Sequence, residues 1–244
     1  MKNKITLLSI IAALILGLGA CSDRSICIKG NGHSESKSFE ISDFESVELQ
    51  DAFDVTIKQG EKFSVIATGD ENILTSLQVT KIGNSCRLDF EKGCYKDYNI
   101  NVEVTMPTIT GAELDGSGNM SIGGFNASND LDLELNGSGN IELNDISNIK
   151  SLSAEINGSG NINTHSTTNN MDQLDVQIIG SGSFLGFGAT TSTASCHIEG
   201  SGNCEVSVSE NLSAEITGSG NVLYKGNPKI DSQISGSGRV IDAN

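Results

Sequence analysis

The fold is decided by the stretch Leu131-Asp-Leu-Glu-Leu-Asn-Gly137-Ser-Gly-Asn-Ile-Glu-Leu143. On both sides of its Gly-Ser-Gly turn, apolar side chains alternate with polar ones, and this period of two is typical of a strand that buries one face. Glycine suits such a corner because it adopts positive φ angles without steric cost and lets neighbouring backbones approach closely. The stretch therefore predicts two strands that face one core and meet at a glycine corner.

The same unit recurs through the C-terminal part of the chain. Gly-Ser-Gly occurs seven times, at spacings of 18 to 22 residues, and the flanking apolar columns repeat with it. The first glycines of the turns are Gly116, Gly137, Gly158, Gly180, Gly200, Gly218 and Gly236. Fixed periods of about 20 residues are typical of solenoids. We therefore expect an all-β, right-handed parallel β-helix or solenoid with coils of about 18–22 residues, each holding about three short strands.

Asparagines occupy the third position after the first glycine in most of these turns. The aligned residues are Asn119, Asn140, Asn161, Asn203 and Asn221, and the departures are Ser183 and Arg239. Side-chain amides carry both donors and acceptors. The alignment therefore predicts a hydrogen-bonded ladder between successive coils.

The N-terminal β region, residues 39–107, has two interpretations. Residues 47–55 match residues 133–141 position by position, and residues 65–73 repeat the pattern again, which favours degenerate coils of the same solenoid. The alternative is a separate β subdomain over residues 39–106 with a short helical turn at residues 70–77. Pro107 marks the start of the repeat region, residues 108–244, because proline interrupts strand pairing.

The first 20 residues have the layout of a secretory signal peptide: Lys2 and Lys4, an apolar run at residues 5–16 and a small-residue exit. The run is too short to span a bilayer as a helix, which needs about 20 apolar residues. We therefore predict a cleaved signal peptide over residues 1–20.

The sequence Leu18-Gly-Ala-Cys21 resembles the lipobox of bacterial lipoproteins. The resemblance implies that Cys21 is acylated and begins a lipidated tether over residues 21–38, and two or three acyl chains hold a protein durably on a membrane. Ser22 argues, by the same resemblance, against retention in the inner membrane. The expected location is the cell envelope, at the periplasmic or surface-exposed face of the outer membrane.

The chain that remains after cleavage is strongly acidic. Without Lys2 and Lys4 the 15 basic residues fall to 13, against 31 acidic ones, so the net charge is −18 with histidine neutral. Nucleic-acid binding depends on basic side chains that neutralise phosphates, so nucleic acid is excluded as a partner. Contact with the membrane is expected through the lipid and not through the protein surface.

Five cysteines remain besides Cys21. Their spacing and the scattered histidines do not fit a zinc site. We expect a disulfide between Cys86 and Cys94 across a short loop. Cys196 and Cys204 lie in the apolar columns, where we expect them to fill the core. A disulfide between them across the Gly200 corner is the alternative.

Three stretches resemble a known family. Phe39-Glu-Ile-Ser-Asp-Phe44, Asp51-Ala-Phe-Asp-Val-Thr-Ile-Lys-Gln-Gly60 and the Gly-Ser-Gly-Asn turns are similar to the auto-transporter adhesin "head GIN" domain family, over residues 39–240. The resemblance implies a parallel β-helical fold and an envelope location. It supplies no catalytic residues.

One candidate binding site stands out, an acidic strip of Glu113, Glu134 and Glu155, each three residues before a corner glycine. Like charges opposed at ladder spacing repel one another. The strip could therefore hold a cation or meet a basic partner. The favoured interpretation is a solvated surface that water and salt screen.

Other site chemistries fit the sequence poorly. The Gly-Ser-Gly turns lead into strands and lack the lysine of a phosphate loop, and they supply serine and asparagine where calcium β-rolls supply aspartate. A polysaccharide-acting β-helix enzyme would need clustered cations and a sugar-stacking aromatic platform, yet the chain has no Trp. We therefore expect no catalytic site, metal or cofactor.

The expected function is a non-enzymatic envelope lipoprotein that presents a rigid β-solenoid for binding or adhesion, with a protein or glycan on the cell surface as ligand. The alternative is an envelope scaffold that associates with itself through open solenoid ends.

Overall fold

The computed structural model describes residues 27–127, 130–167 and 170–244. Strands dominate it, and among the described residues the helix α1 spans four residues, Glu71–Leu74. The N-terminal strands are β1 (Ile28–Lys29), β2 (Ser34–Phe39), β3 (Ser46–Leu49), β4 (Asp54–Gln59), β5 (Ser64–Asp70), β6 (Leu77–Ile82), β7 (Ser85–Phe90), β8 (Tyr95–Lys96) and β9 (Ile100–Met106).

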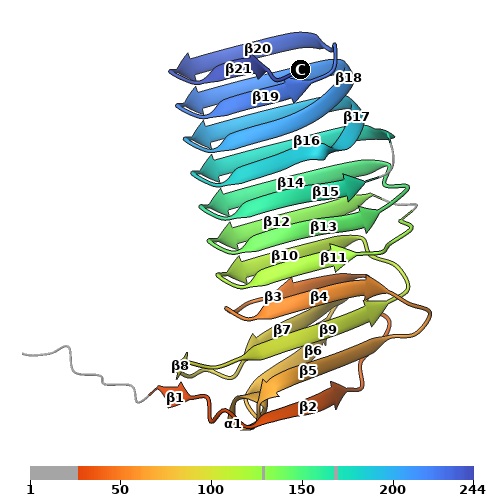
Figure 1. Cartoon of the computed structure of the whole chain (residues 1–244), viewed down its shortest axis with the longest axis vertical. Helices are drawn as coiled ribbons and strands as arrows, with labels where there is room; N and C mark the ends of the chain where they lie inside the picture. The colour runs from red at the N-terminus through yellow and green to blue at the C-terminus, as the bar shows by residue number, and fades with distance from the viewer. Residues whose placement is uncertain (1–26, 128–129, 168–169) are drawn as a thin grey trace, which may run out of the picture.

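The repeat region supplies the remaining strands. They are β10 (Gly111–Gly116), β11 (Asn119–Gly123), β12 (Leu131–Gly137), β13 (Asn140–Ile146), β14 (Ser151–Gly158), β15 (Asn161–Thr167), β16 (Asn170–Gly180), β17 (Ser183–Gly200), β18 (Asn203–Gly218), β19 (Asn221–Lys225), β20 (Lys229–Gly236) and β21 (Arg239–Asp242). They stack as a ladder of coils along the long axis (Figure 1).

The coils build a flattened parallel solenoid with two faces, so the solenoid expected from the repeat is confirmed. Face A contains β7, β3, β10, β12, β14, β16, the second halves of β17 and β18, and β20, all paired in parallel. Face B contains β9, β4, β11, β13, β15, the first halves of β17 and β18, β19 and β21. Each Gly-Ser-Gly corner carries the chain from face A to face B.

Each coil holds two strands, so the expectation of about three was wrong. The return from face B to face A has two forms. Between β13 and β14 it is a loop of residues 147–150, in which Asn148 has a φ of +60°. In β17 and β18 one strand continues around the edge, so the return adds no separate strand.

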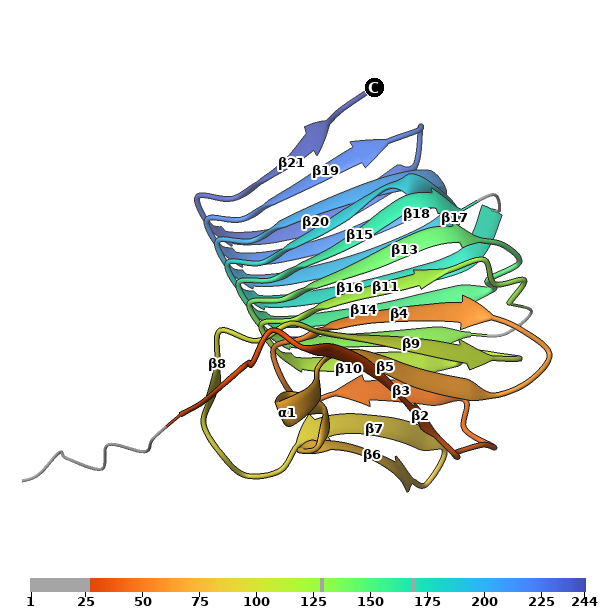
Figure 2. The same cartoon turned by 60° about the horizontal axis from the view of Figure 1, so that its bottom comes forward.

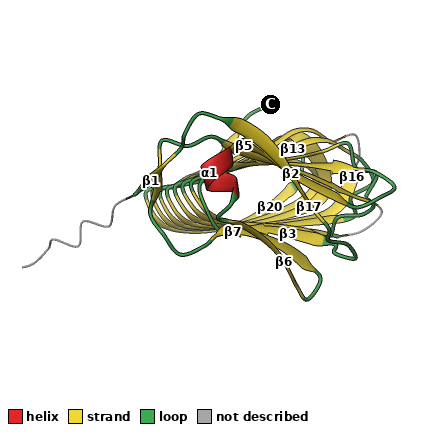
Figure 3. Ribbon diagram, turned by 90° about the horizontal axis from the view of Figure 1, so that it is seen from below, coloured by secondary structure: helices red, strands yellow, loops and turns green. Residues whose placement is uncertain are grey.

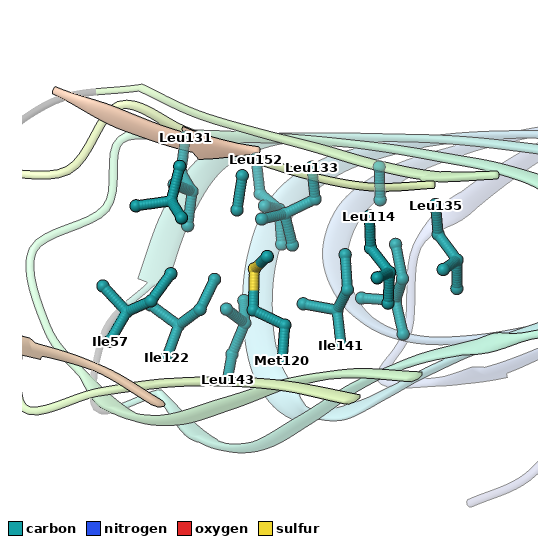
Figure 4. Close-up of a cluster of buried hydrophobic side chains, with 14 of the residues drawn as sticks. Ile57, Leu114, Met120, Ile122, Leu131, Leu133, Leu135, Ile141, Leu143 and Leu152 are labelled. Carbon is teal, nitrogen blue, oxygen red and sulfur yellow. The ribbon is translucent and has the colours of Figure 1, made fainter. Parts of the chain in front are cut away.

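The core lies between the two faces and is built from the apolar columns. Leu135 and Ile141, which flank one corner, are fully buried, and so are Leu114 and Met120 one coil below. Figure 4 shows side chains of face A pointing toward those of face B. Since every coil repeats the same inward positions, burial continues from coil to coil without a break.

The corner glycines lie where a side chain would not fit. All seven first glycines have φ between +126° and +148°. At Gly137 an added Cβ would stand 2.3 Å from the carbonyl oxygen of Gly116, in the coil below. That carbonyl accepts hydrogen bonds from the N–H groups of Ser138 (3.0 Å) and Gly139 (3.2 Å), so the corners themselves are bonded from coil to coil.

The asparagine ladder forms where the sequence is regular. Asn140 donates to Asn119 at 3.0 Å, Asn161 donates to Asn140 at 3.1 Å, and Asn221 donates to Asn203 at 3.0 Å. Ser183 stands between Asn161 and Asn203 in the register.

The N-terminal region consists partly of coils and partly of a cap. The cap comprises β2, β5 and α1, which do not join the parallel coils. β3 and β4 pair in parallel with β10 and β11, with Leu49 opposite Leu114, so residues 47–55 form the coil that their alignment predicts. Residues 65–73 do not form another coil: β5 runs antiparallel to β9 and β2, and α1 follows it. Figure 3 shows α1 at the opening between the two faces, where its residues Ile73 and Leu74 are buried.

The disulfide joins Cys27 to Cys94, with Cα atoms 4.4 Å apart, so the expected pairing of Cys86 with Cys94 was wrong. Cys86 alternates with Leu88 along β7 and is fully buried in the core. Beside the disulfide, β1 pairs in parallel with β8 (Figure 2). The segment expected as a tether is thus fixed to the body from Cys27 onward, while residues 1–26, with the predicted signal peptide and Cys21, lie outside the described residues.

Candidate functional site

The three glutamates of the predicted acidic strip lie together. Glu113 on β10, Glu134 on β12 and Glu155 on β14 are direct partners in the parallel register of face A. Glu48 on β3 extends the row by one coil, because it pairs with Glu113. These four residues form the acidic column, and each is partly buried.

A column of short side chains runs beside the acidic column. At the position two residues earlier, the same strands carry Ser46, Gly111, Asp132 and Ser153. The contrast between short and long side chains leaves a cavity of about 250 Å³, lined by Ser46, Val47, Glu48, Ser85, Gly111, Ala112, Glu113, Asp132, Leu133, Glu134, Ser153 and Glu155. We call this cavity the acidic groove.

The groove continues along the axis. A second hollow of about 170 Å³ shares Ser153 and Glu155 with it and extends over Asp175 and Gln177 to His197. The two hollows together follow face A from β7 to β17. The site is therefore elongated and crosses the strands.

Neighbouring side chains hold the glutamates in place. The Nε of Arg87 lies 2.7 Å from Glu48 Oε2 at the capped end of the groove. Asn136 donates to Oε1 of Glu134 at 2.7 Å, and Asn157 donates to Oε1 of Glu155 at 2.8 Å. Each asparagine thereby orients the carboxylate of its glutamate through one of the two oxygens.

Glu113 is a partly buried carboxyl with acidic neighbours. The pKa of its carboxyl is raised to about 7, mainly by burial and in addition by the charges of Asp115, Glu134 and Glu48. Asp115 in turn accepts a hydrogen bond from Gln50 at 3.0 Å. The acidic groove therefore holds a carboxyl that titrates near neutral pH.

Ser85, at the capped end of the groove, is a buried polar group without a partner. Its residue is 7% exposed, it lines the groove, and its Oγ finds no hydrogen-bond partner among the described residues. Buried hydroxyls are normally bonded, and an unbonded one costs about 1–3 kcal/mol. The hydroxyl of Ser85 is therefore available for a hydrogen bond with a ligand in the groove.

The groove is not built like a metal centre. Within residues 27–127, 130–167 and 170–244, no group of three or more His, Cys, Asp or Glu side chains is placed to hold a metal ion. The acidic column is instead a row with one carboxylate per strand, and neighbouring strands lie about 4.8 Å apart. The carboxylates therefore follow one another along the axis of the solenoid.

Sequence reasoning found part of this site. It identified Glu113, Glu134 and Glu155, and the alignment of residues 47–55 with residues 133–141 gives Glu48 the position equivalent to Glu134. No comparable signal pointed to Ser85 or Arg87, because β7 joins face A from outside the repeat.

The two core cysteines of the repeat lie against each other. The Sγ atoms of Cys196 and Cys204 are 3.1 Å apart, and both thiols are free and buried. Burial raises the pKa of Cys204 well above its usual range, so the thiol stays protonated. Both cysteines fill the core.

Comparison with known proteins identifies similar chains. The family model described as "Putative auto-transporter adhesin, head GIN domain" matches residues 43–228. No curated protein sequence matches the chain. In the part of the chain that the structure describes, no helix is long and apolar enough to cross a membrane.

Three solved structures share the fold. A "putative lipid binding protein" from Parabacteroides distasonis is 24% identical with a TM-score of 0.75, covering 88% of this chain and 99% of its own. A "putative adhesin" from Bacteroides fragilis is 19% identical with a TM-score of 0.79, covering 87% and 98%. A "putative adhesin" from Parabacteroides merdae is 23% identical with a TM-score of 0.69, covering 89% and 99%. At these identities the likeness shows the fold.

Proposed function

Because the chain belongs to the auto-transporter adhesin head GIN domain family, we propose that it is a non-enzymatic cell-envelope protein whose solenoid binds a ligand on face A. The acidic groove carries this proposal: it is a cavity on face A, with oriented carboxylates and a buried hydroxyl that has no hydrogen-bond partner among the described residues. The names of the family and of the similar structures, adhesin and binding protein, support a binding role and an envelope location.

The disulfide supports export independently of the N-terminal sequence. Disulfides such as Cys27–Cys94 persist in oxidising compartments, which include the bacterial periplasm and the cell surface. Cys27 follows Cys21 by six positions, so acyl chains on Cys21 would hold the solenoid close to the membrane. We therefore include lipid anchoring at Cys21 in the proposal, with the outer membrane as the expected location.

Replacing the anchor residue tests this part of the proposal. The Cys21→Ser variant should lose acylation and move from the membrane fraction to the soluble fraction, or accumulate as the unprocessed precursor. Mass spectrometry of the N-terminal peptide and detergent partitioning measure both effects. A variant that partitions like the wild-type protein would rule out the lipid anchor.

Binding is tested by capture. Immobilised full-length protein is exposed to envelope extracts and to a glycan array, beside a variant that carries both Glu134→Gln and Glu155→Gln. A bound component that soluble wild-type protein displaces and that the double variant retains poorly supports the proposal. Equal retention by both proteins would show that the ligand binds outside face A. If neither protein retains a specific component, the binding function is contradicted.

A second candidate function, self-association, rests on the C-terminal coil. Ile230 and Ile234 of β20 are 39% and 42% exposed, whereas Leu212 and Ile216, their partners on β18, are 1% and 0% exposed. No described strand pairs with the outer edges of β20 and β21. Unpaired edges with exposed apolar side chains favour strand addition by another chain.

Mass measurements separate the two candidates. Self-association predicts that the mass from light scattering rises with protein concentration and that Ile234→Lys abolishes the rise. A constant monomeric mass would contradict the scaffold and leave ligand binding as the function.

A further inference from the structure

We infer that the acidic groove binds primary ammonium groups on a flexible chain, as carried by lysine side chains and linear polyamines. The inference rests on the proposed binding function and specifies its ligand chemistry. It follows from the charge of the groove, the carboxylate oxygens that remain free to accept hydrogen bonds, the shape of the groove and the unpartnered hydroxyl of Ser85.

Charge sets the class of ligand. Five carboxylate residues line the groove, namely Glu48, Glu113, Asp132, Glu134 and Glu155, and none of the described residues that line it is Lys or Arg. Arg87 lies at the capped end and is paired with Glu48. The remaining carboxylates therefore attract a cation, and they do so in a cavity where screening by water is weaker than on an open surface.

The hydrogen-bond pattern favours an ammonium over a guanidinium. Arginine recognises a carboxylate best through two parallel hydrogen bonds to both oxygens. Asn136 and Asn157 already donate to Oε1 of Glu134 and Glu155, so a bidentate arginine would have to share that oxygen with the asparagine. An ammonium has three donors and no fixed plane, so it can bond to the second oxygen of adjacent glutamates.

The shape of the groove favours a flexible chain over a bare metal ion. The carboxylates stand in a row across the strands, and no described cluster is placed to hold a metal. The second hollow extends the path as far as His197. A chain with several ammonium groups fits such a row better than one compact ion.

Ser85 is the observation that points to a ligand independently of the charge. Its side chain is buried, lines the groove and has an Oγ without a partner among the described residues. A hydroxyl oxygen accepts hydrogen bonds, so an ammonium in the groove would supply the missing partner.

Proton release should accompany binding. Glu113, whose pKa is about 7, is faced by Glu48 and Arg87 on one side, by Glu134 and Asp132 on the other, and by Asp115 on its own strand. A cation favours the ionised form of this carboxyl. If only the ionised form is competent, apparent affinity rises about tenfold between pH 6 and pH 8.

The test is calorimetric titration of the full-length protein in detergent with spermidine, tetralysine, tetraarginine and magnesium chloride at low salt. Spermidine and tetralysine should bind more tightly than tetraarginine and magnesium. If spermidine alone binds, the ligand is a free polyamine; if tetralysine alone binds, it is a lysine-bearing chain. Either result supports the inference, whereas equal or tighter binding of tetraarginine or magnesium overturns it.

Variants locate the site. Glu134→Gln should weaken ammonium binding about tenfold, while Glu210→Gln, which removes the same charge from an exposed position outside the groove, should change it less than about twofold. Glu113→Gln should remove the rise in affinity between pH 6 and pH 8. Equal effects of Glu134→Gln and Glu210→Gln would show that net charge alone attracts the cation and would overturn the inference.

The two proposals can fail separately. An envelope ligand that the Glu134→Gln, Glu155→Gln double variant retains poorly, without binding of spermidine or tetralysine, contradicts the ammonium site and leaves binding on face A intact. Spermidine binding that Glu134→Gln weakens, without any envelope ligand retained, supports the groove chemistry and contradicts the adhesin-like function. Circular dichroism of each variant checks that the fold is preserved.

Discussion

Replacing Gly137 with alanine tests whether coil stacking depends on the close approach of backbones at the corners. The φ of Gly137 is +131°, and its Cβ would lie 2.3 Å from the oxygen of Gly116. A residue other than glycine that is held at such a φ angle loses about 1–3 kcal/mol of stability. The steric overlap of its Cβ with the neighbouring coil costs about 1–3 kcal/mol more. We expect a loss of about 4 kcal/mol, which lowers the melting midpoint by about 8–16 °C in a chain of this size.

Two other glycines separate these contributions. Gly124 has a φ of +71° but open space around its Cβ position, so Gly124→Ala carries backbone strain without a clash. At Gly139 no positive φ is involved, yet a Cβ would stand 2.2 Å from the oxygen of Gly118, so Gly139→Ala carries the clash alone. The expected loss of stability is therefore largest for Gly137→Ala and smaller for each control.

Thermal and urea unfolding followed by circular dichroism measure these losses. Solenoids can open locally, so hydrogen exchange at the amides of Ser138 and Ser159 should be measured beside global unfolding. If Gly137→Ala unfolds at the same midpoint as Gly124→Ala, contact between the corners contributes nothing and the reasoning fails.

Three further predictions address the disulfide, the titrating carboxyl and the ladder. Cys94→Ser should destabilise the protein by about 4 kcal/mol in the loop-entropy view, and reductant should destabilise the wild type but not the variant; an equal response to reductant would contradict this. Because the raised pKa of Glu113 favours its protonated form in the folded state, stability should fall as pH rises from about 4.5 to about 7; Glu113→Gln should remove that slope, and urea midpoints across this range decide it. Ser183→Asn should complete the ladder between Asn161 and Asn203 and stabilise by about 1 kcal/mol, so a lower urea midpoint would refute a continuous ladder.

The repeat region could be predicted because its determinants are local. In residues 131–143 the alternation of apolar and polar side chains fixes which face is buried, and the corner glycines fix where the chain turns. Since the same pattern recurs, the register follows from aligning the corners, which places Glu113, Glu134 and Glu155 side by side. The acidic strip was therefore visible in the sequence.

The strand pairing of the cap could not be predicted because periodicity does not encode strand direction, although the alternative interpretation placed a short helical turn at residues 70–77, where α1 lies. Residues 65–73 have the spacing of a coil, yet β5 pairs antiparallel with β9 and α1 follows it. The spacing of Cys86 and Cys94 suggested a bridge across a short loop. In the structure Cys86 points inward from β7, and the pairing of β1 with β8 brings Cys27 to Cys94 instead.

The candidate site arises where the repeat meets the cap. A perfectly regular solenoid presents the same surface at every coil, so it offers no unique place for a ligand. The acidic column holds glutamate from β3 to β14, and its positions on β16 and β17 hold Gln177 and His197. At the other end β7 contributes Ser85, whose buried hydroxyl lines the groove, and Arg87, whose guanidinium pairs with Glu48. Specific binding is therefore expected at this junction, where strands from outside the repeat complete the surface.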